Sequence, residues 1–231
     1  MLVVSNIDLT ANTQIMKPST FLESTIKRPT LNINNDYRYL KTGYYVSLHA
    51  EVLGSKVIPS CEDIIDSSRN PILLLRASMA GIPTLPFLVT DSVKKIITEL
   101  NFPIVLFAVN PFIYDGYKTA NNKSALYRAM KSLGMNYKFA VCAQSLKGHM
   151  ISFKSIFGKC NDQDLEVQKI SKMVFEVFKI PVCKLHVQKT DDKAYLCGLQ
   201  PLSKEELSGQ DLQMISTEVS LLTEQGEHFG V

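Results

Sequence analysis

Long apolar runs are missing from the sequence. No run approaches the roughly 20 residues that a transmembrane helix needs, and the longest, such as residues 104–109, have the length of strands. The first ten residues contain no basic segment followed by a longer apolar core, so they predict an opening strand and not a signal peptide. We therefore expect a cytoplasmic protein that has no membrane partner.

Cysteine pairs and catalytic signature motifs are also missing. The five cysteines are odd in number, widely spaced and never arranged as Cys-x-x-Cys, which argues against a disulfide framework and against a zinc knuckle. The chain has no Gly-x-Ser-x-Gly elbow, no P-loop and no His-Glu-x-x-His helix. We expect reduced, mostly buried thiols, and no metal site.

An excess of one charge is missing as well. The 25 basic and 22 acidic residues leave a net charge of +3, which gives no argument for a nucleic-acid or membrane partner. What the sequence does have is size and apolar content. Its 231 residues, 45% of them hydrophobic, can bury a substantial core and form one large domain or two small ones.

Strands and helices alternate in the first part of the sequence. Residues 2–5 and 31–33 have β-type composition, and residues 56–58 form a third short strand before Pro59. Between the last two, Tyr45, Leu48 and Val52 recur at helical spacing, and Gly54 supplies the stop. A strand, a helix and a strand in this order predict a β-α-β unit.

Hairpin patterns dominate the second part, so the sequence predicts an α/β fold of the mixed α+β kind in two lobes. We place the N-terminal β-α-β region at residues 1–68, a second region with C-terminal antiparallel hairpins at 69–223, and a tail at 224–231. The expected elements are a helix at 72–79 with Asn70 as N-cap, a strand at 87–89, a helix at 92–100 capped by Thr90 or Asp91, a strand at 104–109, a loop at 110–122, a helix at 123–133, a hairpin joining 139–144 to 150–157, a helix at 165–178 with Leu165 on its apolar face, a hairpin joining 182–187 to 195–199, and a helix at 211–222.

Several short strings follow one another in the central part of the chain: Ala80-Gly81-Ile82-Pro83-Thr84, Pro86-Phe87, Phe102-Pro103-Ile104-Val105-Leu106 and Tyr114-Asp115-Gly116, followed later by Leu199-Gln200-Pro201. In this order the strings resemble the ATP-grasp enzymes. Carboxyaminoimidazole ribonucleotide synthases and biotin carboxylases share this order of elements. The resemblance implies a two-lobed ATP-grasp-like fold.

The N-terminal third resembles the RimK-like ATP-grasp N-terminal domain, which precedes the catalytic module in some bacterial proteins. This second resemblance rests on Asp36-Tyr37-Arg38-Tyr39-Leu40, Gly43-Tyr44-Tyr45-Val46-Ser47-Leu48, Ile58-Pro59-Ser60, Phe157-Gly158-Lys159 and Phe175-Glu176-Val177-Phe178. The two resemblances differ over a catalytic site, so both a shortened ATP-grasp enzyme and an expanded accessory domain stay open.

The resemblance to the enzymes also implies where charged residues should lie. The family lysine that contacts phosphate is matched by Phe107, and its hinge glutamate by Gln144. The metal-binding Glu-x-Asn segment is matched by Gly198-Leu199-Gln200, which offers no carboxylate to Mg²⁺. The glycine-rich phosphate loop is reduced to Asp115-Gly116, with Lys118 as the nearest cation. If ATP binds, we expect Lys118, Asp115, Gly116 and Gln144 to contact it.

Tyrosines and basic residues alternate near the N-terminus. Arg38, Lys41 and Tyr44 form a candidate site for an anion or a peptide, although tyrosines packing a helix beside solvated cations explain the same pattern. We do not expect a nucleic-acid partner there. Cys183 and His186 form Cys-x-x-His within a strand, where alternation sends them to opposite faces and prevents joint chelation.

Two hypotheses follow. The first is a non-catalytic ATP-grasp-related protein that serves as a binding or regulatory partner of a ligase or of a peptide substrate, in a homo-oligomer or hetero-oligomer or as a single chain. The alternative is a divergent carboxylate–amine ligase that uses ATP and Mg²⁺, with Lys118 and one of Lys147 or Lys154 contacting phosphate.

Overall fold

The computed structural model describes residues 1–10, 14–110, 113 and 116–224, which form three sheets. The strands are β1 (Leu2–Ser5), β2 (Ile15–Met16), β3 (Thr30–Ile33), β4 (Val57–Ile58), β5 (Leu88–Thr90), β6 (Ile104–Ala108), β7 (Tyr117–Ala120), β8 (Val141–Ser145), β9 (His149–Ile156), β10 (Val182–Lys189) and β11 (Ala194–Gln200). The α-helices are α1 (Pro18–Leu22), α2 (Thr42–Val52), α3 (Cys61–Ser68), α4 (Asn70–Met79), α5 (Val93–Glu99), α6 (Lys123–Leu133), α7 (Leu165–Phe178) and α8 (Gly209–Glu224).

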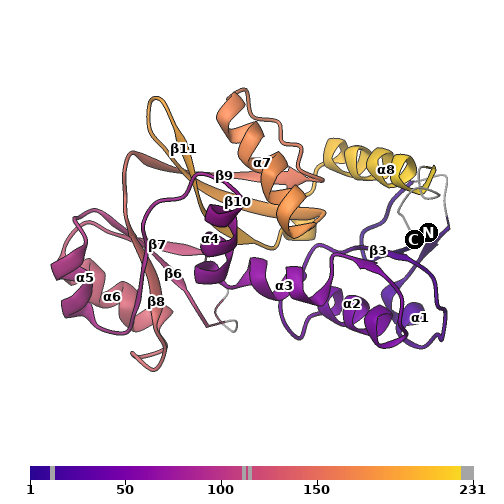
Figure 1. Cartoon of the computed structure of the whole chain (residues 1–231), viewed down its shortest axis with the longest axis horizontal. Helices are drawn as coiled ribbons and strands as arrows, with labels where there is room; N and C mark the ends of the chain where they lie inside the picture. Colours follow the sequence, from indigo (N-terminus) through magenta and orange to yellow (C-terminus); the bar gives the residue numbers. More distant parts are fainter. Residues whose placement is uncertain (11–13, 111–112, 114–115, 225–231) are drawn as a thin grey trace.

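The first sheet is parallel, in the order β2-β1-β3-β4, and helices cover both of its faces. Every residue of β1 and β3 is buried, as expected when both faces of a parallel sheet are covered. Because successive side chains alternate, Leu2 and Val4 pack with Val46 of α2, whereas Val3 packs with Ile215 of α8. This sheet and its helices occupy one end of the molecule (Figure 1).

The other two sheets are antiparallel and share an apolar layer. The sheet β5-β8-β6-β7 turns Ile104 and Leu106 toward α5 and α6, and Val105 and Phe107 toward the sheet β11-β10-β9. That third sheet turns Leu185 in the opposite direction, into a core built with α3, α4 and α7. Figure 1 shows α5 and α6 at the end of the molecule opposite to α1 and α2, with α7 between them.

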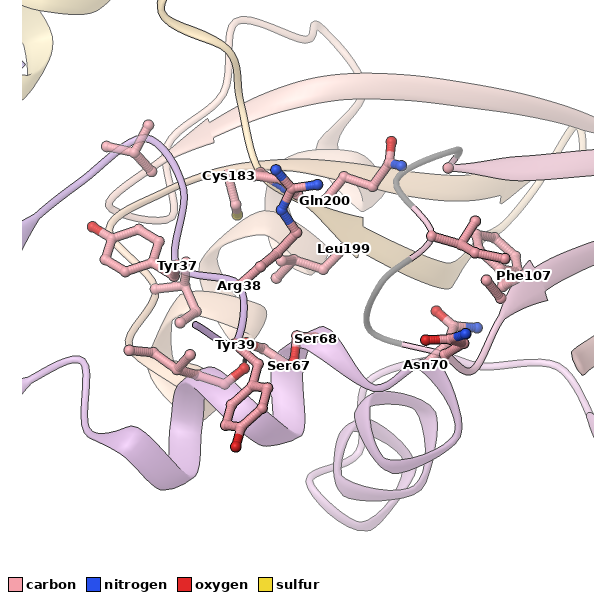
Figure 2. Close-up of a pocket in the computed structure, with 18 residues that line it drawn as sticks. Tyr37, Arg38, Tyr39, Ser67, Ser68, Asn70, Phe107, Cys183, Leu199 and Gln200 are labelled. Carbon is pink, nitrogen blue, oxygen red and sulfur yellow. Dashed lines mark hydrogen bonds between the residues drawn. The ribbon is translucent and has the colours of Figure 1, made fainter. Parts of the chain in front are cut away.

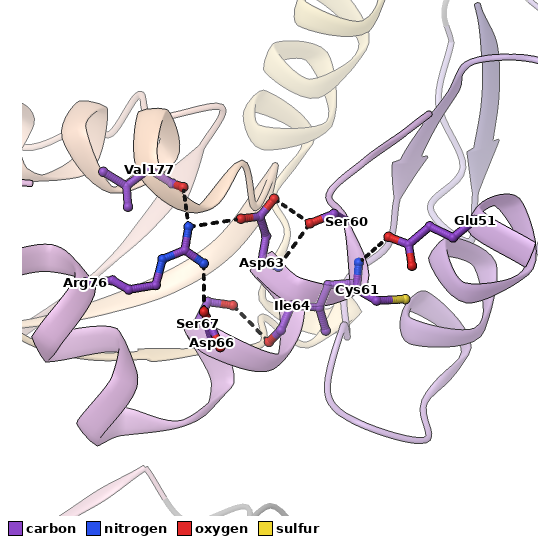
Figure 3. Close-up of polar contacts among 9 residues, drawn as sticks. All are labelled: Glu51, Ser60, Cys61, Asp63, Ile64, Asp66, Ser67, Arg76 and Val177. Carbon is purple, nitrogen blue, oxygen red and sulfur yellow. Dashed lines mark hydrogen bonds and ion pairs between the residues drawn. The ribbon is translucent and has the colours of Figure 1, made fainter. Parts of the chain in front are cut away.

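An arginine joins the helices around the middle core (Figure 3). Arg76 of α4 donates from Nη1 to Asp66 Oδ2 at 2.8 Å and from Nη2 to Asp63 Oδ1 at 3.4 Å, and both carboxylates belong to α3. The same Nη2 lies 3.4 Å from the carbonyl oxygen of Val177 in α7, and the guanidinium carbon lies 5.0 Å from the centroid of the Phe178 ring. The Arg76 side chain therefore connects α4 to both α3 and α7.

The expected mixed fold, with its N-terminal β-α-β unit and its C-terminal antiparallel hairpin β10-β11, is confirmed. The bounds of α6 and α7 agree with the expected helices at 123–133 and 165–178, and Gly54 ends α2 with φ +75°. The free cysteines are buried except Cys160, which is partly exposed. The domain limits at 68 and 223 stay a prediction, and residues 225–231 of the expected tail lie outside the described ranges.

The expected hairpin between 139–144 and 150–157 is wrong. β8 pairs with β5 and β6, whereas β9 pairs with β10, so the two strands enter different sheets. Gly148, with φ +99°, redirects the chain between them, and a β-carbon there would lie 2.2 Å from the carbonyl oxygen of Lys189. Alternation identified the strands, but it carries no information about which strand each one pairs with.

The expected apolar face of α2 is wrong in part, since Leu48 packs against the middle core but Tyr45 and Val52 do not. Tyr45 is 43% exposed and Val52 is 77% exposed, while Ser47 and Ala50 are buried. The reason is that small residues allow close packing here: the hydroxyl of Ser47 donates to the carbonyl oxygen of Pro59 at 2.6 Å. A buried face that is small and partly polar leaves little hydrophobic signal in the sequence.

Smaller corrections concern helix ends and one strand. Ser92, and neither Thr90 nor Asp91, caps α5 by accepting from the backbone N–H of Lys95. Asn70 lies inside α4, whose N-cap is Arg69, and Leu165 is 76% exposed. The expected loop at 110–122 contains β7, which pairs with β6.

Within the described ranges, none of the helices combines the length and the apolar content that crossing a membrane requires.

We predict that Arg76→Met lowers the free energy of unfolding by about 1–3 kcal/mol, because two partly buried carboxylates lose a charged hydrogen-bond partner. The measurement is urea denaturation followed by circular dichroism. Lys95→Met is the matched control, since its carboxylate partner Glu99 is about half exposed and an exposed pair contributes at most about 1 kcal/mol. Equal stability of Arg76→Met and the native chain would contradict this account of α3, α4 and α7.

Candidate functional site

A cavity of about 80 Å³ lies between the two antiparallel sheets and the helix pair α3 and α4. We call it the central cavity (Figure 2). Phe107 and Asn70 lie at one end, Tyr37 and Tyr39 at the other, and Arg38 and Gln200 between them. Small-molecule sites usually measure roughly 300–1,000 Å³, so the central cavity is small for a nucleotide.

Phe107 and Gly198 close one end of the central cavity by direct packing. Phe107 is 4% exposed on β6, and Gly198 lies opposite on β11. A β-carbon at Gly198 would lie 2.6 Å from Phe107 Cε1, a distance that real β-carbons do not show. The phenyl ring therefore fills the space that any side chain at position 198 would need.

Next to this contact, three polar side chains are connected by hydrogen bonds. Nδ1 of His186 lies 2.7 Å from Ser152 Oγ, and its Nε2 lies 2.7 Å from Gln200 Oε1. The ring also meets Tyr117 edge to face, with centroids 5.2 Å apart. A neutral imidazole satisfies both bonds if Ser152 donates to Nδ1 and Nε2 donates to Gln200, so the orientation of the Gln200 amide is fixed.

Burial keeps this imidazole neutral. Burial lowers the pKa of His186, the hydrogen bond to Gln200 opposes this, and the nearby Lys184 acts in the same direction as burial, so that the pKa falls from 6.5 to about 4. Gly116 leaves room for the oriented amide, since a β-carbon there would lie 2.5 Å from Gln200 Nε2. Among the described residues, the group that lies beside both the imidazole and Gly116 is the Gln200 amide and not a carboxylate.

Of the residues expected to contact ATP, the three that the structure describes are not brought together. Gly116 lines the central cavity, but Lys118 follows Tyr117 on β7 and lies on the opposite face, beside Ala125 and Arg128 of α6. Gln144 is fully buried, and its Nε2 donates to the carbonyl oxygen of Leu85 at 2.9 Å. Asp115 lies outside the described residues. Contact of any of these four with ATP stays a prediction.

Other expected phosphate contacts also lie elsewhere. Lys154 pairs with Asp211 at 2.6 Å, across the interface between β9 and α8, and Lys147 follows β8. Neither lines the central cavity among the residues described for it.

The three residues expected to bind an anion or peptide separate in space. Arg38 lines the central cavity and forms an ion pair with Asp36, donating from Nε to Oδ1 at 2.9 Å. Lys41 is the exposed N-cap of α2. Tyr44 is 9% exposed and packs edge to face on Tyr39, with centroids 5.1 Å apart, so it supports the cavity wall from behind.

The sequence did not single out the link from Ser152 through His186 to Gln200. The expected alternation is confirmed, because Cys183 and His186 face opposite sides of β10. Ser152 pairs directly with His186 in the register of β9 and β10. The contact between Ser152 and His186 could have been predicted only by recognising that β9 pairs with β10. Among the described residues, no group of three His, Cys, Asp or Glu side chains could hold a metal ion.

The fold is that of the ATP-grasp proteins. The chain superimposes on a RimK domain ATP-grasp protein from Sphaerobacter thermophilus with a TM-score of 0.65 and 12% identity, covering 94% of this chain and 98% of that one. It superimposes on a D-alanine–D-alanine ligase from Bacillus anthracis complexed with ATP with a TM-score of 0.62 and 14% identity, covering 98% and 99%. It superimposes on the ATP-grasp ligase PsnB, complexed with its minimal precursor, with a TM-score of 0.61 and 12% identity. This match covers 97% of this chain and 98% of PsnB.

The family is defined more narrowly by sequence. The model of the RimK-like ATP-grasp N-terminal domain matches residues 18–218, so the chain belongs to that family. Both expected resemblances are therefore confirmed, and so is the two-lobed ATP-grasp-like fold. A search among curated proteins finds no match to the chain.

The residues present do not fit a magnesium nucleotide at the positions matched to the enzymes. Phe107 offers no cation, and its ring occupies the space that a carboxylate side chain at position 198 would need. Mg²⁺ requires anionic oxygen ligands, and Gln200 supplies only an amide. We therefore derive no catalytic step through ATP or Mg²⁺.

We predict that the burial of His186 makes the chain less stable in mild acid. In the unfolded chain the imidazole takes up a proton near its ordinary pKa of 6.5, whereas the folded chain resists protonation until about pH 4. The free energy of unfolding is therefore at its full value above about pH 6.5. It decreases as the pH falls toward 4, by about 3 kcal/mol in total. Urea denaturation across this range should show a smaller loss for His186→Gln than for the native chain. His149→Gln, at an exposed position, should retain the native pH dependence.

We also predict a strong coupling between Phe107 and Gly198. Gly198→Ala alone should destabilise the chain by about 1–3 kcal/mol, because the added methyl group meets a buried ring. In a Phe107→Ala background the same methyl group enters the vacated space, so the second substitution should cost much less. A double-mutant cycle of unfolding free energies measures the coupling. Additive effects would show that the ring does not fill the space at position 198.

Proposed function

We propose that this chain is a non-catalytic member of the ATP-grasp superfamily that acts as a binding or regulatory partner of a ligase or of a peptide substrate. The packing of Phe107 on Gly198 is the observation that supports this most strongly. Acyl-phosphate chemistry needs a cation on the phosphates and carboxylates on Mg²⁺. An apolar ring packed against a glycine supplies neither. The phenylalanine at 107 and the glycine at 198 also fit each other in shape, because any larger residue at 198 would collide with the ring.

The rest of the central cavity supports binding as the remaining function. Its walls include Leu199 and Val182, which are apolar, and its polar groups include Arg38 and the oriented amide of Gln200. Apolar walls with a few fixed polar groups are the usual composition of a binding site. Such a site can hold the side chains and one or two backbone groups of an extended peptide without performing chemistry on it.

The decisive experiment measures the melting temperature with and without millimolar Mg-ATP. A ligand present at 100 times its Kd adds about 2.7 kcal/mol to the stability of the native state, which raises the melting temperature of a chain of this size by several degrees. We expect no rise for this chain, while an ATP-binding ligase of the same fold, run in parallel, should show one.

The control variants identify the competing hypothesis. If Mg-ATP raises the melting temperature and Lys118→Ala removes the rise while Lys95→Ala retains it, the chain binds the nucleotide through Lys118 and the proposal is wrong. A chain that binds no Mg-ATP excludes the carboxylate–amine ligase.

A further inference from the structure

The segment from residue 116 to residue 161 contains eight lysine or arginine residues and no aspartate or glutamate. The whole chain has a net charge of only +3, so this segment concentrates positive charge that the rest of the sequence balances. Part of it, α6 and the loop that follows, lies at the end of the molecule far from α1 and α2 (Figure 1). An uneven distribution of this kind creates a local potential although the net charge is small.

The exposed side of α6 combines these cations with exposed rings. We define the basic face of α6 as Lys123, Tyr127, Arg128, Lys131 and residues 135–138, all of which are exposed. Tyr127 is 52% exposed, and Met135 and Tyr137 are each more than 40% exposed. Buried on the other side of the helix are Leu126, Met130 and Leu133, which fix its orientation against β6.

Among the residues that the structure describes, the cations of this face have no acidic partners. Lys123, Arg128, Lys131 and Lys138 form no ion pair with a carboxylate of the described residues. The helix packed beside α6 is α5, and its only glutamate, Glu99, already lies 4.0 Å from Lys95. The potential of the face is therefore not neutralised by its neighbours.

The loop after α6 holds its side chains in a fixed arrangement. Met135, Asn136 and Tyr137 have left-handed φ values of 49°, 58° and 62°. Backbone bonds from Asn136 N to the carbonyl oxygen of Lys131 (2.8 Å) and from Phe139 N to that of Gly134 (3.0 Å) hold this conformation. The hydroxyl of Tyr137 donates to the carbonyl oxygen of Tyr127 at 3.1 Å. A left-handed run of side-chain-bearing residues is costly, so its persistence indicates a constrained, preformed surface.

Two shallow depressions flank Arg128. One has Ala125 and Ala129 in its floor, and the other is lined by Lys131, Ser132 and Met135. Each combines apolar atoms with a cationic rim. This combination matches a peptide in which carboxylates alternate with apolar side chains, since the apolar groups enter the depressions while the carboxylates meet the rim.

A nucleic acid matches the face less well. Nucleic-acid affinity grows with the number of phosphates that cations neutralise, about 6–10 in strongly salt-dependent complexes, whereas the basic face of α6 offers four cations that form no ion pair with a described carboxylate. We propose that the basic face of α6 is a docking surface for an acidic peptide segment with interspersed apolar residues. The proposal concerns a surface separate from the central cavity, and it does not depend on whether the chain binds ATP.

Fluorescence anisotropy of the full chain tests the proposal at low and at physiological salt. The probe is a short labelled peptide of aspartate, glutamate, leucine and glycine, and its matched control has asparagine and glutamine in place of the acids. We expect binding of the acidic peptide only, weakened by salt. The double variant Arg128→Gln with Lys131→Gln should raise its Kd about tenfold, as expected for the loss of two rim charges.

Matched variants separate a specific face from general attraction. Lys169→Gln with Lys172→Gln makes the same change in charge on α7 and should leave the Kd within about twofold of the native value. Met135→Ser should weaken the leucine-containing peptide and leave unchanged a peptide with serine in place of leucine. Melting temperatures confirm that each variant is folded.

Three results would overturn the proposal. The first is equal binding of the neutral and the acidic peptide. The second is an equal loss of affinity in the α6 and α7 double variants, which would leave only nonspecific charge attraction. The third is tighter binding of an oligothymidylate than of the acidic peptide, which would make the partner of this face a nucleic acid.

Discussion

The contact between the Phe107 ring and Gly198 joins the two antiparallel sheets beside the central cavity. Only glycine leaves room for the ring, and the ring in turn replaces the solvent and ions that a charged site would contain. Tyr117 and His186 pack around the same ring, with centroids 5.7 and 6.3 Å away. Contacts of this kind between rings add about 0.5–1.5 kcal/mol beyond their burial. The position of the two sheets relative to each other thus depends on an apolar junction.

This junction also determines what the central cavity can present. Because no carboxylate enters it from β11, the polar groups nearest the ring are amides, and one of them is oriented by a neutral histidine. The chain has the ATP-grasp fold. Arg38 brings a charged group to the wall of the central cavity, whereas the cations of α6 lie on an outward-facing surface.

The sequence predicted helices and strands well where each has a strong pattern of its own. The segment that forms α6 has an asparagine cap, a regular apolar face and a terminal glycine, so its bounds follow from local chemistry. The face of α2 could not be predicted in this way, because its close approach uses Gly43, Ser47 and Ala50, none of which is strongly apolar. The partners of β8 and β9 depend on contacts between distant segments, which local patterns do not encode.

The same distinction applies to the candidate site, because some of its residues follow from local sequence and others depend on contacts between distant strands. Resemblance to the family identified Phe107, Gly198 and Gln200, because these positions follow recognisable strings. It placed Lys118 near the phosphates because it is close in sequence, whereas its position on β7 turns it toward α6. Had residues 117–120 been recognised as a strand, alternation alone would have put Tyr117 and Lys118 on opposite faces. The partnership of Ser152 with His186 needed the register of two strands that the sequence had assigned to different hairpins.

The helices that cover the first sheet come from opposite ends of the described chain. α2 follows directly after β3, but α8, which buries Val3 and Ile33 from the other side, is synthesised more than 150 residues later. During translation the parallel strands therefore emerge with one apolar face still uncovered. A ribosome that adds about 5–20 residues per second leaves that face exposed for roughly ten seconds or longer. The native cover of that face becomes available only after α8 has left the exit tunnel.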